Sequence, residues 1–259
     1  MMPSLFVSHG APDLLIGELP ARQFLIDLPP SLRRPRAICV ASAHYEHDDP
    51  HVTREAAPRT IHDFGGFDPS LYQVQYRAHG DPQLAARVAT LLEQAGFKAT
   101  LDDQWGYDHG TWCPLALMYP QADIPVIALS VSRRRDAAWH FALGRALAAL
   151  RADDVLVLGS GSLTHNLGEV VPPDSNDRAP DFVHAFADWF EDRLAAHDEA
   201  SLLAWSAQAP SARRNHPSSE HLMPFFVALG AAGEGWRSSR LHQSVSYRAL
   251  RLDAFRFDA

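Results

Sequence analysis

The chain has few of the features that mark secreted, membrane-bound or nucleic-acid-binding proteins. It has two cysteines, Cys39 and Cys113, in 259 residues, which favours reduced thiols in a cytoplasmic compartment over a disulfide framework. No apolar run approaches the length of a membrane-spanning helix, and residues 1–5 lack the pattern of a signal peptide. The formal net charge of −8 argues against nucleic acid or an anionic membrane surface as a partner. We therefore expect a soluble cytoplasmic protein with neither kind of partner.

The chain also lacks anything that would divide it. No internal repeat, low-complexity tract or linker interrupts its 259 residues, which are enough to bury a sizeable core. Short β-branched apolar runs alternate with helical segments along its length. That pattern is typical of a mainly parallel sheet covered by helices on both faces. We therefore expect residues 1–259 to form a single α/β domain.

The hydrophobic pattern and the turn residues predict the following elements. The expected strands span residues 4–9, 36–44, 97–101, 124–131 and 155–165, with an alternating edge strand at 244–257. The expected helices span residues 20–28, 81–96, 137–150, 181–197, 201–209 and 216–230. Asp81 is expected to cap the second of these helices, with Gly96 just beyond its end, and Pro217 to begin the last. The stretches 47–70 and 105–113 are expected to be loops.

Histidine, in contrast, is abundant, with 14 in the chain. Three of the expected strands end on one: His9, His44 and His165. The carboxyl ends of parallel strands meet at one edge of a sheet, where ligands bind in open α/β folds. Neutral imidazole is the commonest ligand for transition metals. The sequence therefore predicts that these histidines converge on a metal-binding crevice.

Six short motifs, spread over residues 5–247, occur in an order that resembles a known family. They are Ser-His-Gly at 8–10, Ser-Ala-His at 42–44, Asp-Phe-Gly-Gly-Phe at 63–67, Asp-His-Gly-Thr-Trp at 108–112, Gly-Ser-Gly-Ser-Leu-Thr-His-Asn at 159–166, and His-Pro-Ser-Ser-Glu-His at 216–221. The set resembles the class III extradiol ring-cleaving dioxygenases, and within them the 4,5-DOPA dioxygenase-like branch. The Gly-Ser-Gly-Ser run is not a dinucleotide-binding fingerprint, because the third glycine is missing.

The resemblance implies an enzyme that opens the ring of a DOPA-like catechol with O2 at one non-haem divalent metal. The metal is expected to be Fe(II) for activity, and Zn2+ can be bound in isolated protein. The resemblance implies that His9 and His44 are metal ligands and that the third ligand is either Glu220 or His221. His221 is favoured, because this branch resembles enzymes with an all-histidine site.

Further roles follow from the same resemblance and from the chemistry of ring opening, which requires proton transfer. His165 is the expected acid and base, and Asn166 is expected to orient it or the substrate. His109, with its side chain oriented by Asp108, is the expected hydrogen-bond donor to bound oxygen or substrate. His216 is expected to cap a helix start or to contact the substrate.

Two other functions remain open at this point. A zinc-dependent hydrolase or lyase could use the same histidines to activate water, and a non-catalytic binding protein could retain the crevice without the chemistry. Neither the particular catechol nor the oligomeric state can be read from the sequence.

Overall fold

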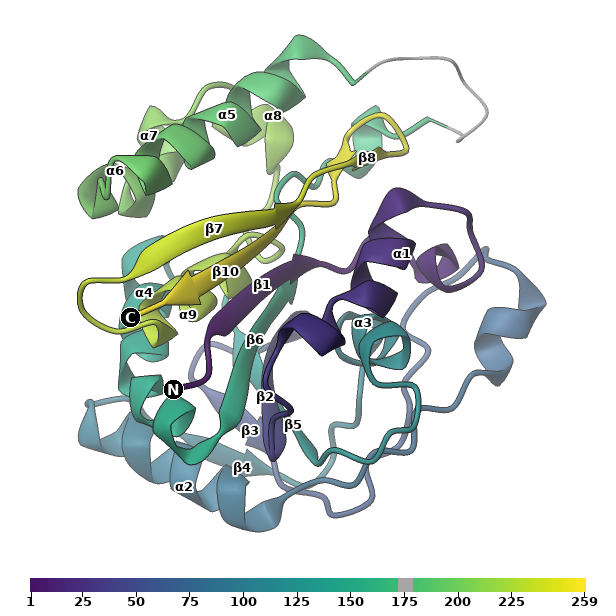
Figure 1. Ribbon diagram of the computed structural model, residues 1–259, viewed down its shortest axis with the longest axis vertical. Coiled ribbons are helices and arrows are strands. Elements are labelled where there is room, and N and C mark those ends of the chain that lie inside the picture. The colour runs from purple at the N-terminus through teal and green to yellow at the C-terminus, as the bar shows by residue number, and fades with distance from the viewer. Residues whose placement is uncertain (172–178) are drawn as a thin grey trace.

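A β-sheet runs through the middle of the protein in the computed structural model, which describes residues 1–171 and 179–259 (Figure 1). The strands are β1 (Ser4–Ser8), β2 (Ala37–Glu46), β3 (His51–Thr53), β4 (Thr100–Asp102), β5 (Val126–Val131), β6 (Val155–Gly161), β7 (Arg237–His242), β8 (Val245–Ser246), β9 (Leu250–Arg251) and β10 (Ala254–Asp258). The α-helices are α1 (Pro20–Asp27), α2 (Pro82–Gln94), α3 (His109–Met118), α4 (Ala137–Ala146), α5 (Asp181–Ala195), α6 (Glu199–Leu203), α7 (Trp205–Gln208), α8 (Ala212–Asn215) and α9 (Met223–Ala231).

The main sheet, within the described residues, has the strand order β4-β3-β5-β2-β6-β1-β10-β7. Its centre is parallel, because β2 pairs with β5 and β6, and β6 pairs with β1. Antiparallel pairs lie on either side, β3 with β5, and β10 with both β1 and β7. The expected α/β fold with a mainly parallel sheet is confirmed. The parallel centre brings the carboxyl ends of β1, β2 and β6 to one edge.

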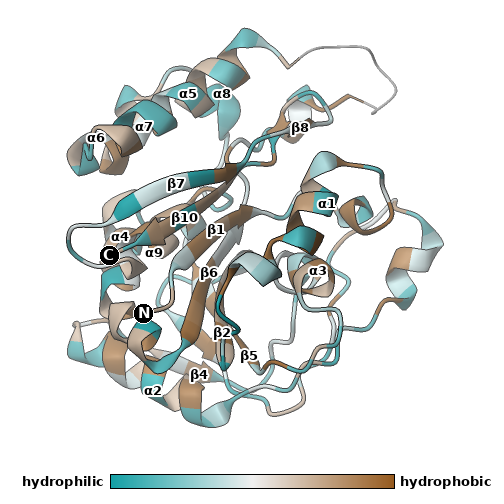
Figure 2. Cartoon of the chain, in the orientation of Figure 1, coloured by the Kyte–Doolittle hydropathy of each residue, from teal (hydrophilic) through white to brown (hydrophobic). Residues whose placement is uncertain are grey.

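Each face of the sheet has its own hydrophobic core, because successive side chains of a strand point to opposite faces. Phe6 and Val157 belong to one core, and their neighbours Leu5 and Leu156 belong to the other. Helices α4 and α9 cover the first face, and α1 and α3 cover the second (Figure 1). Figure 2 shows apolar residues concentrated on the central strands, with polar residues on the outer helices. Helices therefore cover both faces, as predicted.

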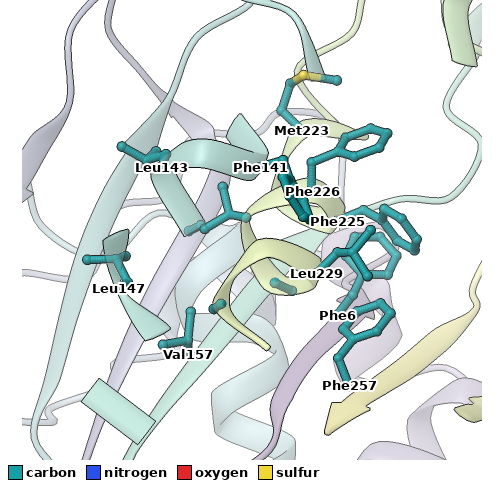
Figure 3. Close-up of a cluster of buried hydrophobic side chains, with 14 of the residues drawn as sticks. Phe6, Phe141, Leu143, Leu147, Val157, Met223, Phe225, Phe226, Leu229 and Phe257 are labelled. Carbon is teal, nitrogen blue, oxygen red and sulfur yellow. The ribbon is translucent and has the colours of Figure 1, made fainter. Parts of the chain in front are cut away.

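Helix α9 is apolar on every side because it is buried on every side. All of its residues are buried, and it packs between α4 and the strands β1 and β6. Figure 3 shows Phe225, Phe226 and Leu229 of this helix packed among Phe6 of β1 and Phe141 of α4. The rings of Phe6 and Phe225 meet edge to face, with 5.4 Å between their centroids. This packing fixes the start of α9, and with it the turn that precedes the helix.

Most of the predicted elements are present, with ends shifted by a few residues. Asp81 caps α2 as expected, since its carboxylate accepts hydrogen bonds from the backbone N–H groups of Gln83 (3.1 Å) and Leu84 (2.9 Å). Gly96 follows the helix with a φ of 89°. The strand expected to end on His165 ends earlier, at Gly161.

The prediction of a helix over residues 216–230 is wrong at its start. Helix α9 begins at Met223, and residues 217–222 form bends and turns. His216 follows α8 at its C-terminal end, so it does not cap the start of a helix. The turn is held in place by the backbone N–H of Ser162, which donates to the carbonyl of His221 at 2.8 Å. This contact with the residue that follows β6 outweighs the local preference of Pro217 for a helix start.

The predicted edge strand at 244–257 is also wrong. That segment divides into β8, β9 and β10, and β10 lies inside the sheet between β1 and β7. Strand β7 forms the edge and was not predicted. The stretches 47–70 and 105–113 were expected to be loops, but the first contains strand β3 and the second contains the start of helix α3. In the described residues, no helix combines the length and the apolar character needed to cross a membrane.

Candidate metal centre

Five histidines from separate parts of the chain meet at the carboxyl edge of the parallel strands. His9 directly follows β1, His44 lies near the end of β2, and His165 follows β6. His109 is the first residue of α3, and His221 lies in the turn before α9. The ring centroids of His44 lie 5.0 Å from His9, 3.8 Å from His109 and 4.8 Å from His221. The three strand-end histidines of the sequence prediction thus come together, joined by two from helix ends.

The Nε2 atoms of three of these rings lie close together, with that of His44 next to the other two. The Nε2 atom of His44 lies 3.1 Å from that of His9 and 3.3 Å from that of His221. Nitrogen ligands about 2.1 Å from one metal ion stand about 3.0–3.4 Å apart at octahedral or tetrahedral angles. The donor set therefore fits a divalent transition metal.

The outer nitrogen of each of these rings faces a side-chain oxygen. The Nδ1 atom of His9 lies 3.0 Å from Ser160 Oγ, whose own proton goes to the carbonyl of Gly110. The Nδ1 atom of His44 lies 3.5 Å from Asp63 Oδ2, and that of His221 lies 3.1 Å from Glu220 Oε1. The oxygens of Ser160 and Glu220 accept a hydrogen from Nδ1, and the negative charge of Asp63 favours a proton on the Nδ1 of His44 that it faces, which leaves the lone pair of each ring on Nε2. Outer partners of this kind hold metal-binding histidines in the required tautomer.

Burial keeps the three imidazoles neutral. Burial, followed by the nearby His44 and His109, lowers the pKa of His9 well below its usual value. Burial, followed by His109, lowers the pKa of His44 to about 3, although Asp63 and Glu220 oppose this. Burial, followed by His165 and His44, lowers the pKa of His221 in the same way. All three are therefore able to bind a cation at neutral pH without first losing a proton.

Asp63, to which the sequence interpretation gave no role, joins two of the five histidines. Its Oδ1 accepts a hydrogen bond from the backbone N–H of His109 at 2.8 Å, and its Oδ2 lies 3.0 Å from His109 Nδ1. Burial opposes ionisation of the Asp63 carboxyl, but His109 and His44 bring its pKa below the usual range. The only sequence signal for Asp63 was its place in the motif at 63–67.

The expectation that Asp108 sets the His109 side chain is wrong. Asp108 caps α3, accepting from the backbone N–H of Thr111 at 2.9 Å. It also accepts from Ser42 Oγ at 2.6 Å and from Trp105 Nε1 at 3.0 Å. Asp108 thus orients the helix that carries His109, and Asp63 orients the side chain.

The ring of His165 lies against the ring of His221, with 3.5 Å between centroids and 6° between planes. Burial lowers the pKa of His165 to about 4, against the opposing charge of Glu220. No described residue hydrogen-bonds either of its ring nitrogens. His165 therefore presents a neutral ring with unused nitrogen atoms next to the three converging Nε2 atoms.

Asn166 and His216 use their side chains on nearby backbone. Asn166 donates to the carbonyl of Arg214 at 2.6 Å and accepts from the N–H of Gly168 at 2.9 Å. His216 donates from Nε2 to the carbonyl of Leu163 at 2.9 Å, and its buried Nδ1 has no partner among the described residues. Both residues thus hold the segments beside His165.

Two glycines allow the close approach of the site segments. A Cβ on Gly161 would lie 2.0 Å from the carbonyl oxygen of His221, and one on Gly110 would lie 2.6 Å from Ser42 Oγ and 3.0 Å from His44 Cδ2. These separations are too short for any other residue. The Gly-Ser-Gly-Ser run at the end of β6 therefore lets the turn with His221 lie directly on the end of the strand.

Comparison with known proteins agrees with this geometry. A family model described as the catalytic LigB subunit of aromatic ring-opening dioxygenase matches residues 26–251. A Beta vulgaris protein named 4,5-DOPA dioxygenase extradiol is 40% identical over 258 residues, which covers 98% of this chain and 96% of the relative. An Escherichia coli K12 protein of the same name is 40% identical over 238 residues, covering 89% and 85%. The crystal structure of an uncharacterized protein from Escherichia coli K12 has a TM-score of 0.81 at 31% identity, with 99% of each chain covered.

Proposed function

This chain belongs to the LigB family of aromatic ring-opening dioxygenases, and on that premise we propose that it opens a DOPA-like catechol at one Fe(II) ion held by His9, His44 and His221. It is an extradiol dioxygenase, as its family and its relatives are, and it depends on a non-haem metal. The observation that carries the choice of ligands is that Nε2 of His44 lies 3.1 Å from Nε2 of His9 and 3.3 Å from Nε2 of His221. Bound Fe(II) supplies the redox chemistry that joins a catechol ring to O2, which no side chain provides.

Between the two candidates for the third ligand, the contacts support His221. Glu220 Oε1 lies 3.1 Å from Nδ1 of His221 and accepts a hydrogen bond from Ser218 Oγ at 2.9 Å. The carboxylate thus stands behind the imidazole, on the side away from His44. Glu220 then keeps His221 in the tautomer with a free Nε2.

Proton transfer falls to His165. Its ring is neutral and free of hydrogen bonds from the described residues, so it is ready to accept a proton from a catechol hydroxyl. Its stacking on His221 holds the ring of His165 beside the metal ligands. His109 donates a hydrogen bond to substrate or oxygen, with Asp63 fixing its ring. Asn166 and His216 act on the substrate indirectly, by holding the backbone on either side of His165.

We also propose that residues 1–259 form one catalytic domain and that the protein is cytoplasmic. The single main sheet, which includes both β1 and β10, supports one domain. The cysteines Cys39 and Cys113 are free and buried, which supports a cytoplasmic location.

Oxygen consumption by defined metal forms tests this function. The protein is stripped of metal, reloaded anaerobically with Fe(II) or Zn2+, and given L-DOPA, 4-methylcatechol or buffer in an oxygen electrode. We expect uptake with Fe(II) alone, one O2 per catechol, and formation of a yellow ring-opened semialdehyde. His79→Gln, at an exposed position, is the control variant. If Fe(II) is bound at one equivalent but no catechol is consumed, the dioxygenase proposal is wrong.

A further inference from the structure

A second feature at the same edge of the sheet is a largely apolar cleft of about 550 Å³, here called the rim cleft. Its apolar lining is Ala11, Ile16, Phe67, Leu167, Val170 and Leu250. Ala11 and Leu167 stand two residues after His9 and His165 in the chain. Phe67 packs on Phe64 with 5.6 Å between ring centroids, and Phe64 packs on His109 at 5.7 Å. Three segments of the metal centre therefore continue into the rim cleft.

The rim cleft leaves apolar side chains uncovered. Ile16 is 54% exposed and Leu167 is 68% exposed, and the only other exposed large hydrophobic side chain in the described residues is Met1. Uncovered apolar side chains that share one concave surface are typical of a ligand-binding site.

The charge of the rim cleft is negative. Its ionised side chains are Asp13 and Asp68, and no lysine or arginine is among its described lining residues. Asp68 is already used locally, because its Oδ1 accepts from the backbone N–H (2.8 Å) and the hydroxyl (2.7 Å) of Ser70. The rim cleft thus favours a cationic ligand over an anionic one.

Asp13 has an unused acceptor. Its Oδ2 accepts a hydrogen bond from the hydroxyl of Tyr247, whereas its Oδ1 is buried and has no partner among the described residues. A buried carboxylate oxygen without a donor is unfavourable, so a donor supplied by a ligand would be well bound. An ammonium group next to the carboxylate would supply both the hydrogen bond and the opposite charge.

The loop that supplies Tyr247 is strained. Tyr247 has a φ of 50° and Arg248 a φ of 69°, both in the left-handed region. Non-glycine residues in this conformation cost free energy and tend to occur at functional sites. Burial, followed by the hydrogen bond to Asp13, raises the pKa of Tyr247. The tyrosine therefore remains a donor that occupies Oδ2 and leaves Oδ1 for a ligand.

We propose that the rim cleft binds the side chain of the catechol substrate, and that Asp13 Oδ1 accepts a hydrogen bond from a protonated amine on that side chain. The inference rests on the proposed function, because it places the ring at the metal centre. Asp13 is then the residue that selects, among catechols, those whose short alkyl side chain carries an amine.

Three catechols that differ only at the end of the side chain test this. We compare kcat/KM for dopamine, 4-ethylcatechol and 3-(3,4-dihydroxyphenyl)propanoate in the Fe(II)-loaded wild type, Asp13→Asn and Asp68→Asn. We expect Asp13→Asn to lower kcat/KM for dopamine by roughly 10- to 100-fold, the range of a hydrogen bond to a charged group, with little change for 4-ethylcatechol. Asp68→Asn removes the same charge from the same cleft but no free acceptor, so it should affect dopamine less.

Two results would overturn the inference. One is an equal loss with all three catechols in Asp13→Asn, which would mean a structural role for Asp13. The other is a wild-type preference for the propanoate, which would favour the separate pocket lined by Arg133 and Arg213. Ile16→Lys changes an exposed position and should still fold, and it should lower kcat/KM for dopamine but not for the propanoate.

The inference and the proposed function can fail separately. Titration calorimetry with phenethylamine, which has the amine but no hydroxyl groups, measures the rim cleft without ring opening. If no catechol consumes O2 but phenethylamine binds and Asp13→Asn weakens that binding at least tenfold, the function is wrong and the amine site stands. If phenethylamine binds wild type and Asp13→Asn equally, the amine site is wrong whatever the oxygen electrode shows.

Discussion

The histidines of the metal centre differ in how the second ring nitrogen is used. Ser160, Asp63 and Glu220 face the Nδ1 atoms of the three rings whose Nε2 atoms converge. His165 has no such partner among the described residues. A ring whose Nδ1 faces an acceptor is suited to bind a metal through Nε2, and a ring free at both nitrogens is suited to carry a proton.

Replacing His165 should therefore separate chemistry from metal binding. We expect His165→Gln to lower kcat by roughly 100- to 10,000-fold, the contribution of a general acid or base, while the iron content stays at one per chain. Oxygen uptake and metal analysis of the same sample measure the two effects. Loss of iron together with activity would mean that His165 mainly supports His221, on which it stacks.

Replacing Asp63, in contrast, should weaken metal binding. Asp63→Asn keeps the size of the side chain but removes the charge that faces His44 and His109. We expect metal affinity to fall by roughly 10- to 100-fold, as for other partners behind a ligand. Competition with a chelator measures this, and Asp27→Asn, at an exposed acid on α1, is the charge-matched control. Unchanged affinity would limit Asp63 to a role in placing His109.

The histidines could be predicted from the sequence, but their partners could not. His9, His44 and His165 lie at the ends of apolar runs, and a strand end is a local signal. Asp63 meets His109 from 46 residues away and Ser160 meets His9 from 151 residues away. Asp108 lies beside His109 in the sequence but points at Thr111 and Ser42 instead. Only the fold brings such partners together.

Among the structural elements, the end of β6 and the turn before α9 are in direct backbone contact. The backbone N–H of Ser162 donates to the carbonyl of His221 at 2.8 Å, and Gly161 lies beneath the same carbonyl. Because the two elements touch through backbone, the position of His221 depends on the absence of a side chain at residue 161.

Substitution of this glycine should therefore affect the metal centre. The added Cβ of Gly161→Ala would lie 2.0 Å from the His221 oxygen, so the turn must move. Overpacking of this kind costs about 1–3 kcal/mol, and we expect a lower Tm together with weaker metal binding. Thermal unfolding with and without added metal measures both. Gly65 has open space around it, so Gly65→Ala is the control and should leave Tm and metal binding unchanged. Normal metal binding by Gly161→Ala would mean that this backbone contact does not position His221 for the metal.

The same distinction between local and distant contacts explains which elements were predictable. Helix α2 has its own cap, apolar stripe and terminal glycine, and its prediction is confirmed. The start of α9 depends on β6, and the interior place of β10 depends on β1, which it meets across roughly 250 residues. Neither dependence is present in the local pattern.

For the molecule as a whole, a metal ion at His9, His44 and His221 would join segments separated by most of the chain. A ligand that binds only the folded state stabilises it by about 2.7 kcal/mol at 100 times its Kd. For a chain of this size that corresponds to a rise in Tm of roughly 5–10 °C. Calorimetric scans of stripped and Fe(II)-loaded protein measure the shift. His221→Ala should abolish it and His79→Gln should retain it; an equal shift in both would point to metal bound elsewhere.

The strand order has a consequence for synthesis on the ribosome. Strand β1 lies between β6 and β10 in the sheet. When a nascent chain has emerged only as far as β6, β1 can therefore pair along one of its two edges and not along the other. The other side stays open until residues 254–258 have left the exit tunnel. Until then the apolar strand has an unpaired edge of the kind that chaperones recognise and that promotes association between chains. Translational pauses late in the message should therefore matter more to the yield of native enzyme than pauses early in it.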